Sequence, residues 1–132
     1  MIDRDPNYSE EVERRFRAPP AAGELPPGNG VEVAAEAGSR AAGALVQLRA
    51  LVDGERIAAV RFHAYGCPHL IAAASWTAEQ LSGSTPALLL AWDWQSAAGA
   101  LEVPPGKFGR LLVLQDAVRN LGIACTRLTP AA

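Results

Sequence analysis

The chain has 132 residues, of which 49% are hydrophobic and 20% are charged, a composition typical of one globular domain that spans residues 1–132. Its formal net charge of −2 provides no basic footprint for nucleic acid, and its longest apolar run is far too short to cross a membrane. Without a secretory h-region, and with only Cys67 and Cys125, the sequence favours reduced thiols in the cytoplasm.

The first predicted element is a short charged helix, because Tyr8, Val12 and Phe16 recur every four residues and form a narrow apolar stripe. Prolines and glycines fill residues 18–30, which are therefore expected to form a surface loop.

Three segments after this loop are expected to form an antiparallel sheet. Residues 45–52 and 57–65 alternate between apolar and polar positions, and Asp53-Gly54 between them favours a hairpin turn. Residues 31–37 have a weaker strand pattern. One apolar and one polar face is typical of an antiparallel sheet. The predicted apolar face carries Val46, Leu48, Ala50, Val52, Ala58, Val60, Phe62 and Ala64, with Arg61 and His63 opposite.

The apolar spacing then becomes helical, which predicts a helix over 68–82. Thr85 as N-cap and Pro86 at the first position predict a second helix, whose apolar sequence indicates a buried element. A third helix over 108–121 is expected to end near Gly122. The predicted fold is α+β, with an N-terminal helix, a small three-stranded antiparallel sheet, and helices packed on one face of that sheet.

Cys67 lies where the third strand meets the next helix. Pro68 suits the first helical position, so Cys67 is expected at the N-cap, where the helix dipole stabilises a thiolate. Thiolates bind metals and attack sulfur, but a small apolar residue filling this corner is an equal alternative. His69 forms a Cys-x-His pair with Cys67, and His63 lies on the strand's polar face, which is a weak metal-binding pattern. The alternative is that each histidine is a surface or hydrogen-bonded residue.

Three segments carry a family resemblance. Residues 7–23 contain the first helix and a proline loop, residues 60–83 a strand ending in Tyr-Gly-Cys before a small-residue helix, and residues 101–121 a Val-Pro-Pro-Gly-Lys segment before a helix. In this order and spacing they resemble the IscU/NifU N-terminal family of iron–sulfur cluster assembly scaffolds. The resemblance implies the same α+β fold, a part in cluster assembly, and iron or a [2Fe–2S] cluster as the bound species.

The family holds its cluster with three cysteines, aided by an aspartate and a histidine, and this chain departs from that set. The resemblance places the first cysteine and the aspartate at Ala42 and Ala44, and the third cysteine at Arg110. Cys67 is the one that remains, since Cys125 matches no ligand position and is expected to be a packing cysteine. A [2Fe–2S] cluster needs four donors, so one chain is expected to bind at most a weak zinc or iron ion.

Arg110 would place a guanidinium beside Cys67, where its charge favours a thiolate and opposes a bound cation. A homodimer is the alternative way to complete a ligand set.

The family's partners are a cysteine desulfurase and an Hsp70-type chaperone. The resemblance implies that the chaperone would contact Val103, Pro104, Pro105, Gly106 and Lys107. Extended proline segments lose little entropy on binding. Alternatively, the segment is only the loop that leads into the last helix.

Three hypotheses follow. In the first, the protein is a degenerate scaffold that binds iron or a cluster through Cys67 with donors from a second subunit. In the second, it is an interaction module that docks through residues 103–107. In the third, the thiol of Cys67 accepts sulfur. The sequence contains no nucleophile–base–orienter set and no phosphate-binding loop, so it does not predict an enzyme.

Overall fold

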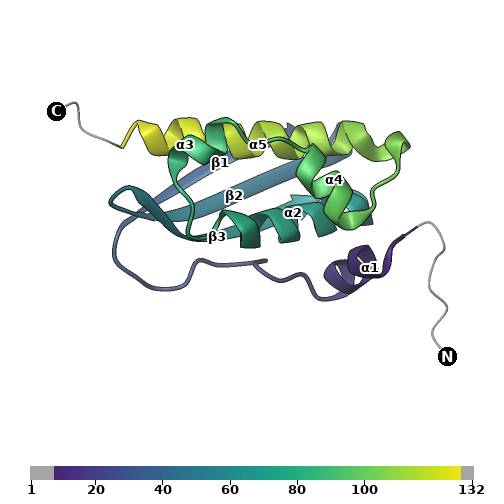
Figure 1. Cartoon of the computed structure of the whole chain (residues 1–132), viewed down its shortest axis with the longest axis horizontal. Helices are drawn as coiled ribbons and strands as arrows, with labels where there is room; N and C mark the ends of the chain where they lie inside the picture. The colour runs from purple at the N-terminus through teal and green to yellow at the C-terminus, as the bar shows by residue number, and fades with distance from the viewer. Residues whose placement is uncertain (1–7, 129–132) are drawn as a thin grey trace.

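The structure, a computed structural model, describes residues 8–128 and confirms the α+β fold (Figure 1). Its antiparallel sheet has the strand order β1-β2-β3. The elements are α1 Glu10–Arg17, β1 Val31–Ser39, β2 Ala44–Asp53, β3 Arg56–Tyr65, α2 Pro68–Leu81, α3 Pro86–Leu90, α4 Gln95–Leu101, the 3-10 turn η1 Pro105–Lys107, and α5 Phe108–Thr126.

The helices cover one face of the sheet, as predicted. α5 packs across β1 and β2, α2 packs on β3, and both lie in front of the sheet in Figure 1. α1 packs on α2, α3 on α5, and α4 contacts both α2 and α5. Within residues 8–128, no helix has the length and apolar character that a bilayer crossing requires. The core between the layers includes Val46, Leu48, Val60, Phe62, Leu70, Leu111, Leu114 and Leu121.

One predicted inward residue of β3 points the other way. The strand register shifts between Leu51 and Val52, so Ala58 has no cross-strand partner. Ala58 is exposed, and Ile57 is fully buried in its place. An extra residue in one strand reverses which side chains face the core, and the predicted alternation holds only from Val60 onward.

The predicted buried helix after Pro86 is two short helices, α3 and α4. Leu89 is buried, whereas Leu88 and Leu90 are exposed, so α3 has a single inward side chain between two outward ones. α4 begins at Gln95, whose backbone N–H donates to Asp93 Oδ1 at 2.7 Å. The apolar run was therefore a poor guide to burial here.

The last helix does not end near Gly122 but continues to Thr126. Gly122 is a packing residue instead. A Cβ at this position would lie 2.9 Å from the Cβ of Leu89 and 3.1 Å from the backbone nitrogen of Leu90. The missing side chain is what allows α3 to approach α5 so closely.

The apolar stripe predicted for α1 is only partly correct. Val12 is fully buried, but Phe16 is 45% exposed, and Arg15 is buried instead. Ser9 is the N-cap, and its hydroxyl accepts a hydrogen bond from the backbone N–H of Val12. The Arg15 guanidinium donates to Glu11, Ser75 and Glu79 and so joins α1 to α2.

Candidate functional site

Three segments far apart in sequence meet at one end of the sheet. Arg110 Nη1, near the start of α5, donates to the carbonyl oxygen of Gly43 in the β1–β2 turn at 3.3 Å. A Cβ on Gly66, between β3 and α2, would lie 3.3 Å from the same oxygen and 2.7 Å from Leu70 Cδ2. Glycine therefore permits this close approach. We call residues 42–44, Gly66, Cys67 and Arg110 the Cys67 corner.

Cys67 is the N-cap of α2, with Pro68 at the first helical position, as predicted. Its backbone is extended, with φ −74° and ψ 164°, and its carbonyl accepts the first helical hydrogen bond from Ile71 at 3.1 Å. The side chain makes no capping hydrogen bond, and the thiol is free and half-buried. Solvent can therefore reach a sulfur at the positive end of a helix of 14 residues.

His69 is not a surface residue beside this thiol. It is 2% exposed and packs against Tyr8, with the ring centroids 4.8 Å apart and the ring planes at 54°. This contact lies between α2 and the segment that leads into α1. The structure thus gives His69 a packing role, while its use as a ligand stays a prediction.

His63 is exposed on the face of the sheet that α2 and α5 leave open. It lines a hollow with Arg40 and Tyr65, and Cys67 is not part of that lining. Among residues 8–128, no three His, Cys, Asp or Glu side chains gather closely enough to hold a metal ion.

The other family ligand positions are also at the Cys67 corner. Ala42 is exposed in the β1–β2 turn, where its N–H donates to Ser39 Oγ at 3.1 Å, and Ala44 is buried at the start of β2. Neither methyl group has a lone pair. The guanidinium of Arg110 reaches this turn, and among the described residues no hydrogen bond or ion pair joins it to Cys67.

The segment predicted to bind a chaperone is split between core and surface. Val103 is 6% exposed and packs in the core, whereas Pro104, Pro105 and Gly106 are exposed. Pro104 is extended, and η1 then leads directly into α5. Partner contacts at Val103 would require its side chain to leave the core, so the exposed prolines are the accessible part of the segment.

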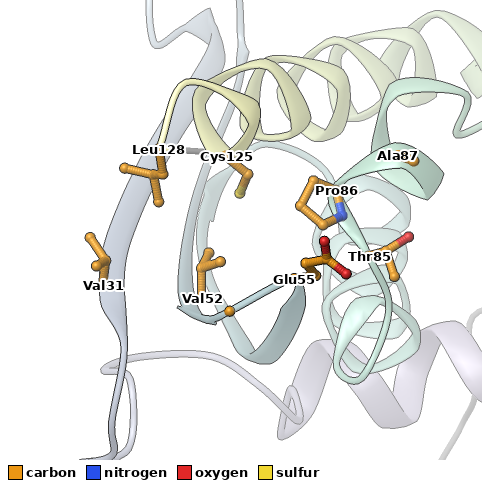
Figure 2. Close-up of a pocket in the computed structure, with 9 residues that line it drawn as sticks. Val31, Val52, Glu55, Thr85, Pro86, Ala87, Cys125 and Leu128 are labelled. Carbon is orange, nitrogen blue, oxygen red and sulfur yellow. The ribbon is translucent and has the colours of Figure 1, made fainter. Parts of the chain in front are cut away.

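A second candidate site lies at the opposite end of the sheet and was not predicted from the sequence. It is a pocket of about 630 Å³ that Cys125, Val52 and Glu55 help to line. In Figure 2 the Cys125 side chain points toward this pocket, with Val52 and Glu55 across from it. We call this cavity the Cys125 pocket. Cys125 is 1% exposed, and burial raises the pKa of its thiol. The lining comes from four segments that are far apart in the sequence, namely Val31, Val52, Gly54, Glu55, Thr85, Pro86, Ala87, Cys125 and Leu128.

Solved structures share this fold. The chain is similar to a thermophile protein from Fervidobacterium islandicum, described as a candidate iron–sulfur cluster assembly scaffold for the SUF system, with a TM-score of 0.66 and 19% identity. That match covers 88% of this chain and 96% of the other. A second, a hypothetical protein, has a TM-score of 0.53 and 20% identity over 89% of this chain and 90% of its own. At these identities the likeness concerns the fold.

Sequence comparison identifies the family. The chain is 27% identical over 114 residues to the iron–sulfur cluster assembly protein IscU of Plasmodium falciparum. The aligned region covers 86% of this chain and 70% of that protein. The profile of the NifU-like N-terminal domain matches residues 7–122, nearly all of the described fold and the whole Cys67 corner. The chain therefore belongs to the NifU-like N-terminal domain family of iron–sulfur cluster assembly scaffolds.

Proposed function

We propose that this protein takes part in iron–sulfur cluster assembly as a degenerate scaffold. It keeps the fold and one thiol of its family but holds no stoichiometric [2Fe–2S] cluster on its own chain, and it acts as a carrier or docking partner rather than an enzyme. The observation that supports this role is the make-up of the Cys67 corner. It offers one half-buried thiol, with alanines at two of the family's ligand positions and an arginine at a third.

The residues present do not fit a cluster. A [2Fe–2S] cluster needs four donors, normally thiolates or imidazoles. Ala42 and Ala44 supply none, His69 packs against Tyr8, and the positive charge of Arg110 opposes a bound cation. Iron or a cluster carried by this protein would need donors from outside the chain, and a second copy is the simplest source.

Anaerobic reconstitution with ferrous iron and sulfide tests this proposal. We expect less than one iron per chain after desalting and no charge-transfer absorbance of a cluster. Two irons and two sulfides per chain, lost in Cys67→Ala, would overturn it. The Cys125→Ala variant is the matched control, because Cys125 is buried at the other end of the molecule.

A second candidate function is sulfur acceptance, which the accessibility of the Cys67 thiol favours. The Cys67 thiolate would attack the outer sulfur of a persulfide on a cysteine desulfurase. The donor's S–S bond breaks, its cysteine leaves as a thiolate, and Cys67 becomes the persulfide without net oxidation. Intact mass after incubation with desulfurase and cysteine should rise by one sulfur in wild type and Cys125→Ser. It should not rise in Cys67→Ser, and an equal gain there would exclude this function.

The exposed Pro104, Pro105 and Gly106 favour a docking role as a third candidate. A peptide spanning residues 101–109 should compete with the whole protein for an Hsp70-type chaperone, whereas a scrambled peptide should not. If the intact protein does not bind the chaperone, or if both peptides compete equally, the segment is only the approach to α5.

A further inference from the structure

The open face of the sheet carries two arginines directly opposite each other. Arg49 of β2 pairs with Arg61 of β3 in the antiparallel register. Like charges at directly opposed positions destabilise a sheet. Within residues 8–128 neither guanidinium forms an ion pair, and Arg61 donates only to the adjacent carbonyl of Val60 at 2.9 Å. The described residues form no ion pair that offsets this repulsion, and a local conflict of this kind is typical of a functional surface.

The cationic character continues along the same face. Because side chains alternate, every second pair of β2 and β3 faces this side, and the next two are Gln47–His63 and Leu45–Tyr65. The Arg40 guanidinium lies 5.0 Å from the centre of the Tyr65 ring, in a cation–π contact. A hollow of about 210 Å³ lies here, lined by Arg40, Leu45, Gln47, His63, Ala64 and Tyr65. We call Arg40, Arg49, Arg61, His63 and Tyr65 the arginine strip.

The arginine strip is open to a partner. α2 and α5 pack on the opposite face, and Arg49, His63 and Tyr65 are exposed. The loop before β1 approaches this face farther along, where Gly28 lies against Leu51.

Glu32 and Glu36 of β1 point to the same side, opposite Leu51 and Gln47 respectively. They place an acidic border along one edge of the arginine strip. An anionic partner would therefore align over β2 and β3 rather than over the whole sheet.

We propose that the arginine strip binds an extended acidic segment of a partner protein. From Arg61 to Tyr65 the strand advances four residues, about 13 Å. In an extended segment, side chains four residues apart also lie on one side at this separation. Of two carboxylates at this spacing, one would accept charge-assisted hydrogen bonds from the Arg49–Arg61 pair, and the other would accept them from Arg40. A nucleic acid fits less well, because the whole chain has a net charge of −2 and lacks a long basic footprint.

Cys67 does not line this hollow, and the Arg49–Arg61 pair lies outside the Cys67 corner, so the test does not depend on metal or sulfur chemistry. The probe is a fluorescent peptide with glutamate at every second position, titrated with the full chain and followed by anisotropy. A glutamine version of the peptide and a single-stranded oligothymidylate serve as comparison probes.

We expect the glutamate peptide to bind, and Arg49→Gln with Arg61→Gln to weaken it about tenfold or more. Arg127→Gln removes an exposed arginine outside the strip and should leave the affinity unchanged. The double variant should melt no lower than wild type, because it removes the like-charge pair, so lost binding would not reflect unfolding. No binding of the glutamate peptide, equal binding by the double variant or the glutamine peptide, or tighter binding of the oligonucleotide would each overturn the proposal.

Discussion

The two ends of the sheet place a free cysteine in opposite surroundings. At the Cys67 corner, a tight turn, the start of α2 and the start of α5 converge through backbone contacts at Gly43 and Gly66, and the thiol is half-buried. At the other end, the last turn of α5 leaves Cys125 buried beside a largely apolar cavity (Figure 2).

The different surroundings predict different reactivities for the two thiols. Thiolates are the reactive form of cysteine, and burial raises the pKa of Cys125, so that thiol is held neutral and covered. Cys67 lies at a helix N-terminus that solvent can reach. The two free cysteines therefore differ in access, since Cys67 is half-buried and Cys125 is buried.

The largest expected effect is on alkylation. Cys67 should react with iodoacetamide at neutral pH about a hundredfold faster than Cys125, since exposing Cys125 requires a local opening that costs about 3 kcal/mol. Peptide mapping after timed quenching measures both rates in one sample. Equal rates would show that the two ends do not differ in the way described here.

The alkylation rate of Cys67 should report the charge of the residue at position 110. Arg110→Glu should slow the alkylation of Cys67 because it replaces a positive charge at the corner with a negative one. The rate at Cys125 should not change. If both rates fall together, the substitution has altered the fold rather than the charge at the corner.

Removal of the Arg15 guanidinium should loosen the packing of α1 on α2. Arg15→Ala leaves Glu11 and Glu79 without their buried partner, and we expect a loss of about 1–3 kcal/mol, reduced because both carboxylates reach solvent. Arg14→Ala is the control, since that neighbouring side chain is exposed and should matter little. Urea unfolding distinguishes them, and equal losses would refute the role of Arg15.

Two glycines of α5 should respond in opposite directions. Gly122→Ala places a Cβ 2.9 Å from Leu89 and should cost about 1–2 kcal/mol despite its better helix propensity. Gly109→Ala, near the Cys67 corner, meets nothing within 4 Å and should gain up to about 1 kcal/mol. Thermal melts measure both, and a stabilising Gly122→Ala would contradict the close packing of α3.

The smallest effect concerns pH. Hydrogen bonds, chiefly from Arg14 and next from Arg15, lower the pKa of the Glu11 carboxyl from its ordinary value of 4.5. The ionised carboxylate therefore stabilises the folded protein above pH 4.5, and this stabilisation is lost as the pH falls through the lowered pKa. Glu11→Gln should cost roughly 0.5 kcal/mol at pH 7, and this cost should shrink as falling pH protonates the wild-type carboxylate. Glu55→Gln, at the opposite end, is the control. A cost that does not shrink as the pH falls would mean that the carboxylate charge is not the cause.

Local patterns predicted much of this fold. The alternation in residues 45–52 and the Pro68 after Cys67 depend on neighbours in sequence, and both predictions are confirmed. Ala58 and Gly122 were misplaced because a strand bulge and a close helix contact are set by distant partners. Arg15 is buried for the same reason, because it pairs with Glu79 on another helix.

The place of Cys67 in the fold was predictable to the same degree, because a cysteine before a helix-starting proline is expected at the N-cap. The Arg49–Arg61 pair requires the strand register, and the Cys125 pocket requires the packing of α5 against β2 and α3, so neither could be found by sequence pattern alone.

The most direct test of the central claim is to restore the missing ligands. Ala42→Cys, Ala44→Asp and Arg110→Cys place donors at the three altered positions of the Cys67 corner. Iron and sulfide are then counted after anaerobic reconstitution, beside wild type and with circular dichroism to verify folding. We predict two irons and two sulfides per folded triple variant and less than one iron per wild-type chain. A full cluster in wild type, or none in a folded triple variant, would contradict the account of an intact scaffold that lacks its ligands.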